Sequence, residues 1–195
     1  MPQKKTIQNK QSPPETEEPP LKRESDMFNF NLLKEAMEFD AGKSEIRTAN
    51  SDWVIIRGDL LRDIFASLRF IFGKSGNTIL KGIGKKVGSN FVHTTLEKGL
   101  GADEVPTILS LLLNQGGWGK TEIKIDFEEK NAIVTMQNCI TARNIKTKEP
   151  SCHFLKGYFE GFFGNIFNLE TECVETSCIA SGGSACVFHL QPLKT

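Results

Sequence analysis

The chain has 195 residues, which suits one ordinary domain and is too short for two enzymatic domains. Its 24 Lys and Arg residues balance its 24 Asp and Glu residues, so no excess of positive charge attracts nucleic acid or an anionic membrane. The composition, with 38% hydrophobic and 25% charged residues, is that of a globular protein, and the longest apolar run (108–113) is too short to cross a bilayer. We therefore expect no direct nucleic-acid binding and no membrane span.

The first 26 residues are rich in proline and charge and contain few apolar side chains. Such a segment cannot bury enough apolar surface to offset the entropy lost on ordering, which predicts a disordered tail over residues 1–26. The tail has no continuous apolar stretch of the kind that a secretory signal needs, so we expect a cytoplasmic protein. Residues 27–195 are expected to fold as a single domain.

The next part of the chain predicts one strand and three helices. Residues 53–56 form a compact apolar run typical of a strand. Apolar residues then recur every three or four positions, which predicts helices over 59–72, 77–98 and from Asp103 to the turn at Gly116. In the second helix the side chains expected to face inward are Leu80, Ile83, Val87, Phe91, Val92 and Leu96. Its glycines at positions 82, 84 and 88 lack the spacing of a phosphate loop, so they predict close packing against another element.

The C-terminal half predicts two hairpins separated by a helix. Apolar and charged residues alternate over 120–127, and a second apolar segment at 132–140 completes the first hairpin. A helix is expected after Pro150, followed by a closing hairpin with strands at 169–176 and 185–190. Because neighbouring strands in the sequence pair in antiparallel fashion, this order favours the α+β class, an antiparallel β-sheet flanked by helices.

Four of the five cysteines are grouped toward the C-terminus. Cys152 starts a predicted helix, where free backbone amides favour a thiolate, and Cys173, Cys178 and Cys186 fall in the closing hairpin. This grouping predicts a zinc site with mostly sulfur ligands, and inert buried thiols are the alternative. The residues alone leave the fourth ligand open between Cys173 and Glu175, which share one face of a straight strand.

The helix after Pro150 combines aromatic residues with glycines. Phe154, Tyr158 and Phe162 recur at four-residue spacing, and the glycines at positions 157, 161 and 164 form a separate stripe. Glycine inside a helix costs on the order of 1 kcal/mol relative to alanine, so three of them indicate a packing or ligand requirement. A large aromatic core and an apolar ligand pocket both fit this pattern.

Two of these patterns resemble the 4-vinyl reductase domain family. One is the spacing Cys152-x22-Glu175-x2-Cys178-x7-Cys186, and the other is the helical motif C-x-F-x-x-G-x-x-x-G that starts at Cys152. The resemblance extends more weakly over residues 45–190. It implies that Cys152, Glu175, Cys178 and Cys186 bind zinc and clamp the C-terminal hairpin, which leaves Cys139 and Cys173 as ordinary thiols.

The implied ligand set has a geometric consequence. Glu175 and Cys178 are three residues apart and would point to opposite faces of a regular strand, so we expect a bend or bulge after Glu175. Three thiolates and one carboxylate close a tetrahedron, which predicts a structural zinc with no open position for catalysis.

The family also implies an apolar cavity, because its members resemble modules that bind hydrocarbons or small aromatic molecules, among them sensor domains of aromatic-degradation regulators. By analogy the candidate ligand-binding residues are Phe91, His93, Trp118, Tyr158 and Phe162. Sensor relatives carry an ATPase and a DNA-binding domain, for which this chain has no room. We therefore expect a small-molecule binding or sensing module that acts through an unidentified protein partner or as a homodimer.

Two other functions remain open at this stage. The TRAPP vesicle-tethering subunits have a similar fold, so the chain is alternatively a scaffold or assembly subunit with a filled interior. The family name suggests an accessory enzyme that reduces a tetrapyrrole vinyl group. The sequence has no dinucleotide-binding fingerprint and no obvious acid–base pair, so it predicts no catalytic residues and favours a binding protein over an enzyme.

Overall fold

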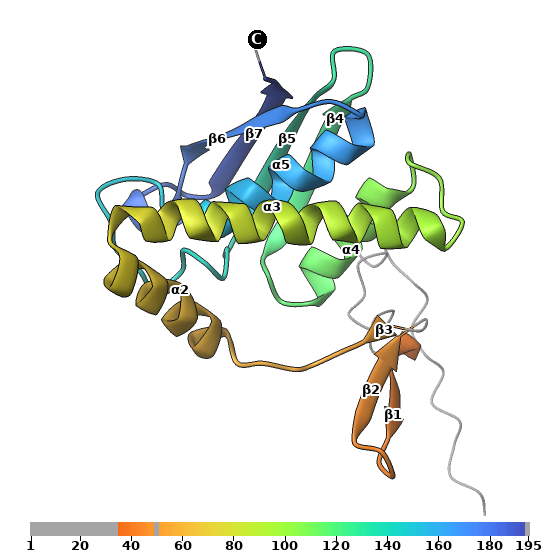
Figure 1. The fold of residues 1–195 in the computed structure, drawn as a ribbon. Coiled ribbons are helices and arrows are strands. Elements are labelled where there is room, and N and C mark those ends of the chain that lie inside the picture. The colour runs from red at the N-terminus through yellow and green to blue at the C-terminus, as the bar shows by residue number, and fades with distance from the viewer. Residues whose placement is uncertain (1–34, 49–50, 194–195) are drawn as a thin grey trace, which may run out of the picture.

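The computed structural model describes residues 35–48 and 51–193, and the predicted tail lies outside them. Within the described residues, four helices cover a main antiparallel sheet, and a smaller sheet precedes them (Figure 1). The helices are α2 (Gly58–Phe72), α3 (Lys74–Glu97), α4 (Val105–Gln115) and α5 (His153–Phe167). A short 3-10 helix, η2, spans Ile179–Ser181.

The main sheet has the strand order β4-β5-β7-β6, and each neighbouring pair is antiparallel. Its strands are β4 (Lys120–Asp126), β5 (Asn131–Gln137), β6 (Thr171–Ser177) and β7 (Cys186–Pro192). Buried and more accessible residues alternate along β5 and β6, because one face of the sheet packs on helices. This arrangement confirms the predicted α+β class with an antiparallel sheet and flanking helices.

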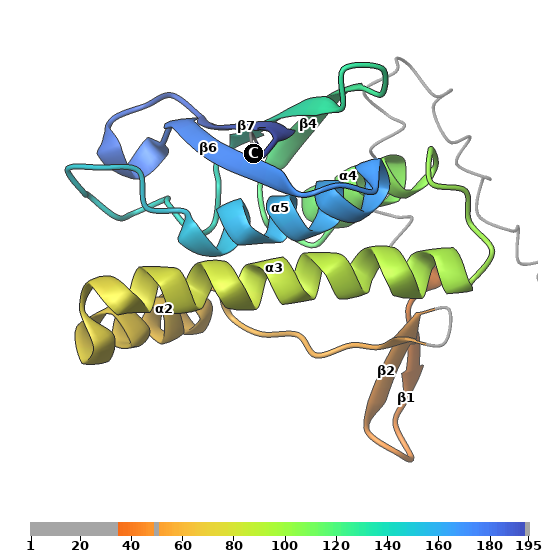
Figure 2. The ribbon, with the colours of Figure 1, turned by 45° about the horizontal axis from the view of Figure 1, so that its top comes forward.

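Helix α5 lies between the main sheet and α3 (Figure 2). It is buried on most sides, which explains why its sequence is so rich in Phe. The aromatic rings of Phe159 and Phe163 are fully buried, and Phe159 packs edge-on against Phe188 of β7 with ring centroids 5.1 Å apart. The C-terminal helix and hairpin therefore share one core.

Glycines bring α3 and α5 into backbone contact. A Cβ atom on Gly84 or Gly88 would overlap the carbonyl oxygens of Phe154 and Tyr158, and one on Gly157 or Gly161 would overlap carbonyl oxygens of α3. The predicted close packing is confirmed at Gly84 and Gly88. It does not extend to the two flanking glycines: nothing lies within 4 Å of a Cβ on Gly82, and Gly164 approaches Leu169 and Thr171 rather than α3.

The small sheet has the order β1-β2-β3 and lies to one side of the helices (Figures 1 and 2). Its strands are β1 (Glu38–Asp40), β2 (Glu45–Thr48) and β3 (Ser51–Asp52). The strand predicted at 53–56 is wrong, because β3 ends at Asp52 and residues 53–57 cross to α2 as an irregular segment. An apolar run cannot distinguish a buried strand from a segment whose side chains line a cavity.

Three side chains of α3 that were expected to face inward do not lie in the core. Ile83, Val87 and Leu96 are exposed, whereas Leu80 and Val92 are buried as predicted. The buried face of α3 is centred on its glycines, since these residues pack directly on α5. The hydrophobic spacing therefore predicted the helix correctly but assigned its buried face too broadly.

Candidate functional site

Four potential metal ligands come together where α5 meets the closing hairpin. Cys152 is the N-cap residue of α5, Glu175 lies on β6, Cys178 follows β6, and Cys186 begins β7. All four are buried, and their ligand atoms all lie within 4.8 Å of one another. The strand pairing shifts register between Glu175 and Ser177, which confirms the predicted irregularity after Glu175 and allows Glu175 and Cys178 to face the same point.

The spacing of the three sulfur atoms fits a tetrahedral metal ion. The Sγ–Sγ distances are 3.7 Å between Cys152 and Cys186, 3.9 Å between Cys152 and Cys178, and 3.9 Å between Cys178 and Cys186. Zinc–sulfur bonds of about 2.3 Å at the tetrahedral angle separate two sulfurs by about 3.8 Å. The three sulfurs thus already lie at the edge lengths of a zinc-centred tetrahedron.

The carboxylate of Glu175 supplies the fourth corner. Its Oε2 accepts a hydrogen bond from the backbone N–H of Cys152 at 3.0 Å, while its Oε1 is buried and has no hydrogen-bond partner among the described residues. Burial raises the pKa of Glu175 to about 8, because the charged carboxylate loses its hydration. A buried, unpartnered carboxylate oxygen beside three sulfurs is a donor that a cation would satisfy.

Groups around the cluster also donate hydrogen bonds to its sulfurs. The Thr141 hydroxyl donates to Cys152 Sγ at 3.2 Å, and the backbone N–H of Ile179 donates to Cys186 Sγ at 3.4 Å. Hydrogen bonding with Cys139 raises the pKa of both Cys152 and Cys186, so these thiols resist ionisation without a cation. A metal ion would supply the positive charge that three thiolates require at this buried position.

The remaining cysteines and the nearby histidine lie outside the cluster. Cys139 is buried next to it and contacts the Thr141 hydroxyl at 3.2 Å. Cys173 is on β6 two residues before Glu175, but its own backbone N–H bonds to Glu160, and it is not grouped with the other sulfurs. His153 begins α5 and is likewise not among the grouped residues. The residues that the family resemblance implied are therefore the ones placed to hold a metal.

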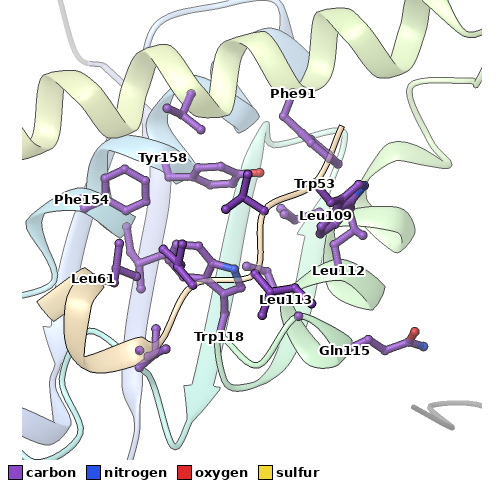
Figure 3. Close-up of a pocket in the computed structure, with 18 of the residues that line it drawn as sticks. Trp53, Leu61, Phe91, Leu109, Leu112, Leu113, Gln115, Trp118, Phe154 and Tyr158 are labelled. Carbon is purple, nitrogen blue, oxygen red and sulfur yellow. The ribbon is translucent and has the colours of Figure 1, made fainter. Parts of the chain in front are cut away.

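A pocket of about 800 Å³ lies between the helices and the segment that precedes α2 (Figure 3). Most of its lining is apolar, with side chains from α3, α4, α5 and residues 53–56. In the described part of the chain, no Asp, Glu, Lys, Arg or His contributes to the lining. Trp118 stacks on Phe154 with ring centroids 6.0 Å apart, and Phe154 in turn stacks on Phe65 of α2 at 5.1 Å. The aromatic rings thus form one rigid wall of the pocket.

The structure brings together three of the five candidate ligand-binding residues. Phe91, Trp118 and Tyr158 line the pocket (Figure 3). His93 is exposed on α3 and does not, because two residues along a helix turn the side chain about 200° away from Phe91. Phe162 is fully buried one turn after Tyr158, where it packs against the Phe91 ring at 6.0 Å behind the pocket.

The sequence did not identify the pocket wall formed by residues 53–56 and by Leu109, Leu112 and Leu113 of α4. These residues were assigned to a strand and to an ordinary amphipathic helix. The one available signal was the run Trp53-Val54-Ile55-Ile56, whose side chains had no predicted partner strand. Val54 and Ile55 are in fact strongly exposed, which is unusual for large apolar side chains.

Comparisons with known proteins agree with this fold. The sequence model of the vinyl-4-reductase domain matches residues 132–192, which include the second half of the first hairpin, α5 and all four grouped ligands. Two uncharacterized proteins of Methanocaldococcus jannaschii, MJ1642 and MJ0745, are 29% identical over 70 residues and 28% identical over 72 residues. These matches cover 35% and 37% of this chain, and 44% and 39% of the relatives, so the chain spans less than half the length of the curated relatives it matches.

Solved structures share the fold over most of the chain. The phenol-responsive sensory domain of the transcription activator PoxR, solved with phenol, has a TM-score of 0.69 at 12% identity, covering 87% of this chain and 91% of that domain. A vinyl-4-reductase family protein of Methanocaldococcus jannaschii scores 0.53 at 19% identity, over 73% and 85% of the two chains. A trafficking protein particle complex subunit 3 of Naegleria fowleri, covalently bound to palmitic acid, scores 0.51 at 14% identity, over 70% and 95%.

Proposed function

From the premise that residues 132–192 form a vinyl-4-reductase domain, we propose that this protein is a small-molecule sensing module. It binds an apolar or aromatic molecule in the pocket between α3, α4 and α5 and passes the binding event to a second protein surface. The observation that carries this proposal is the pocket of about 800 Å³ with an almost entirely apolar lining, since ligand pockets have this size and character. The fold shared with the PoxR sensory domain, which was solved with phenol, supports the same assignment by analogy.

The metal in this proposal is a structural zinc ion held by Cys152, Glu175, Cys178 and Cys186. Three sulfurs and one carboxylate oxygen suit zinc better than the harder cations Mg²⁺ and Ca²⁺, which take only oxygen ligands. With all four positions supplied by side chains, the ion has no site for a reacting water. Its role is to tie β6, β7 and the start of α5 together, and α5 carries Phe154 and Tyr158 into the pocket.

The surface through which such a module would signal is apolar. Phe70 and Ile71 on α2 are 90% and 67% exposed, and Val54 and Ile55 before α2 are 80% and 71% exposed. Exposed apolar side chains in this number are typical of an interface, and homodimerisation through this side of the molecule is our proposal. Because Val54 and Ile55 also line the pocket, a ligand would contact the same segment that the second copy covers.

The filled scaffold of the TRAPP type is the less favoured function, because the interior contains an open pocket rather than a packed core. The described residues include no helix with the length and hydrophobicity that a transmembrane segment requires. An enzymatic role has no support in the pocket, where the described lining offers no ionisable pair for proton transfer.

Native mass spectrometry of the full chain, purified without added metal or ligand, tests this proposal. We expect a mass that corresponds to a dimer with one zinc ion per chain, together with a retained small apolar molecule that is lost on gentle activation. A metal-free and ligand-free monomer that is nevertheless folded would contradict the proposal. Zinc without a pocket ligand, even after incubation with aromatic compounds, would support the scaffold alternative.

A further inference from the structure

The pocket contains two hydrogen-bond donors for which the described part of the chain provides no acceptor. The indole Nε1 of Trp53 is shielded from solvent and has no hydrogen-bond partner within the described residues. The Tyr158 hydroxyl also makes no hydrogen bond to the described part of the chain. Both side chains line the pocket, and Figure 3 shows the Tyr158 hydroxyl directed away from α5, toward the part of the pocket where Trp53 and Phe91 lie. Buried donors are almost always paired in native proteins, so these two indicate an acceptor supplied from outside the chain.

The other polar lining groups do not provide that acceptor. Gln115 also lines the pocket, but it already has an interaction partner. The indole N–H of Trp118 is a donor and therefore cannot accept a hydrogen bond from Trp53 or Tyr158. Water could pair with both donors in the empty pocket, and a ligand that displaces this water must replace its hydrogen bonds to bind well.

The same lining indicates the charge of the ligand. Within the described residues, the pocket has no ionisable acid or base, so a charged ligand would lose its hydration without gaining a counter-charge. Burial raises the pKa of Tyr158, which keeps its phenol group neutral and able to donate a hydrogen bond at physiological pH. The volume of about 800 Å³ exceeds what a single aromatic ring fills and suits a molecule with at least two rings or an equivalent chain.

We infer that the ligand is an uncharged, mainly apolar molecule with a hydrogen-bond acceptor oxygen that the Trp53 indole and the Tyr158 hydroxyl bind. These two residues determine specificity, because they distinguish an oxygen-bearing molecule from a hydrocarbon of the same shape. The inference rests on the proposed function and adds the polar group of the ligand. It also gives the segment before α2 a defined role: Trp53 follows β3 directly, so acceptor binding fixes the position of residues 53–57 between the small sheet and α2.

Two probes of nearly the same shape test this inference by equilibrium dialysis against the full chain. Benzophenone has a carbonyl oxygen where 1,1-diphenylethylene has a methylene group. We expect the wild-type protein to bind benzophenone about tenfold more tightly, since the hydrocarbon leaves both donors unpaired. In Trp53→Phe and Tyr158→Phe, each of which keeps an aromatic ring, the ratio should fall toward one because benzophenone loses affinity. Leu61→Val, a matched change at an apolar lining residue, should preserve the ratio.

The outcomes separate the two proposals. Equal binding of both probes to the wild-type protein would overturn this inference and leave the sensing function intact. Binding of neither probe would overturn both. A benzophenone preference that survives in both aromatic variants would also contradict the assignment to Trp53 and Tyr158. Circular dichroism confirms that each variant is folded, and the two variants report independently if one of them is not.

Discussion

Replacement of Glu175 by Gln is expected to remove the metal ion and to lower the free energy of unfolding by about 3 kcal/mol or more. The amide is a much weaker ligand than the carboxylate, and three thiolates without a complete coordination sphere repel one another in a buried site. Cys178→Ser should have the same effect, because it removes one corner of the tetrahedron whose sulfurs lie 3.9 Å apart. Zinc content by elemental mass spectrometry and denaturant unfolding measure the two consequences.

Cys173→Ser is the matched control for the metal-site variants. Cys173 is buried on the same strand, two residues from Glu175, but its sulfur is not grouped with the four ligand atoms. We expect full zinc content and a loss of about 1 kcal/mol or less from the buried hydroxyl. If Cys173→Ser lost the metal while Glu175→Gln kept it, the ligands would instead be four thiolates, and the account of the site given above would be wrong.

The second large effect is expected at the contact between α3 and α5. Alanine at Gly84 or Gly161 should lower the free energy of unfolding by about 3 kcal/mol, at the upper end of the usual cost of overpacking. The added methyl group would overlap the carbonyl oxygen of Phe154 in the first variant and that of Lys85 in the second. Backbone atoms cannot move aside as a flexible side chain does, so the two helices must separate. Because α5 supplies Phe154 and Tyr158 to the pocket, ligand affinity should fall as well.

Gly82→Ala provides the control on the same helix. A Cβ atom at this position would meet nothing within 4 Å, and the residue is exposed. Alanine there should raise the free energy of unfolding by about 0.5–1 kcal/mol, since it favours the helix and restricts the unfolded chain. Thermal and denaturant unfolding of the three variants would contradict the packing argument if all of them changed stability in the same direction by the same amount.

Sequence patterns predicted the elements that depend on local interactions. The four helices follow from apolar spacing and from glycine or proline near their ends, and both C-terminal hairpins follow from alternation of apolar and polar residues. The grouping of Cys152, Glu175, Cys178 and Cys186 followed from a characteristic spacing of chemically distinctive residues. The expected irregularity after Glu175 is visible as the register shift in β6, because the chain must turn both side chains toward one point.

The pocket was only partly predictable because it depends on contacts between distant segments. Phe91, Trp118 and Tyr158 are aromatic residues that the family resemblance suggested, and they do line it. The same reasoning could not place His93 or Phe162, since helix rotation and packing depth are set by the glycine contact between α3 and α5. Nor could it show that residues 53–56 form a wall, because an irregular segment has no periodic signature.

The most direct test of the sensing function is whether the pocket, and not the exposed apolar surface, binds an apolar probe. Titration of the full chain with the fluorescent probe N-phenyl-1-naphthylamine should show saturable binding of one molecule per chain. In the double variant Val87→Trp and Leu112→Trp, which narrows the pocket from two sides, the account predicts loss of this binding. In Ile71→Asp, which disrupts only the exposed surface of α2, it predicts unchanged binding. Probe binding that survives in the double variant and disappears in Ile71→Asp would contradict the account.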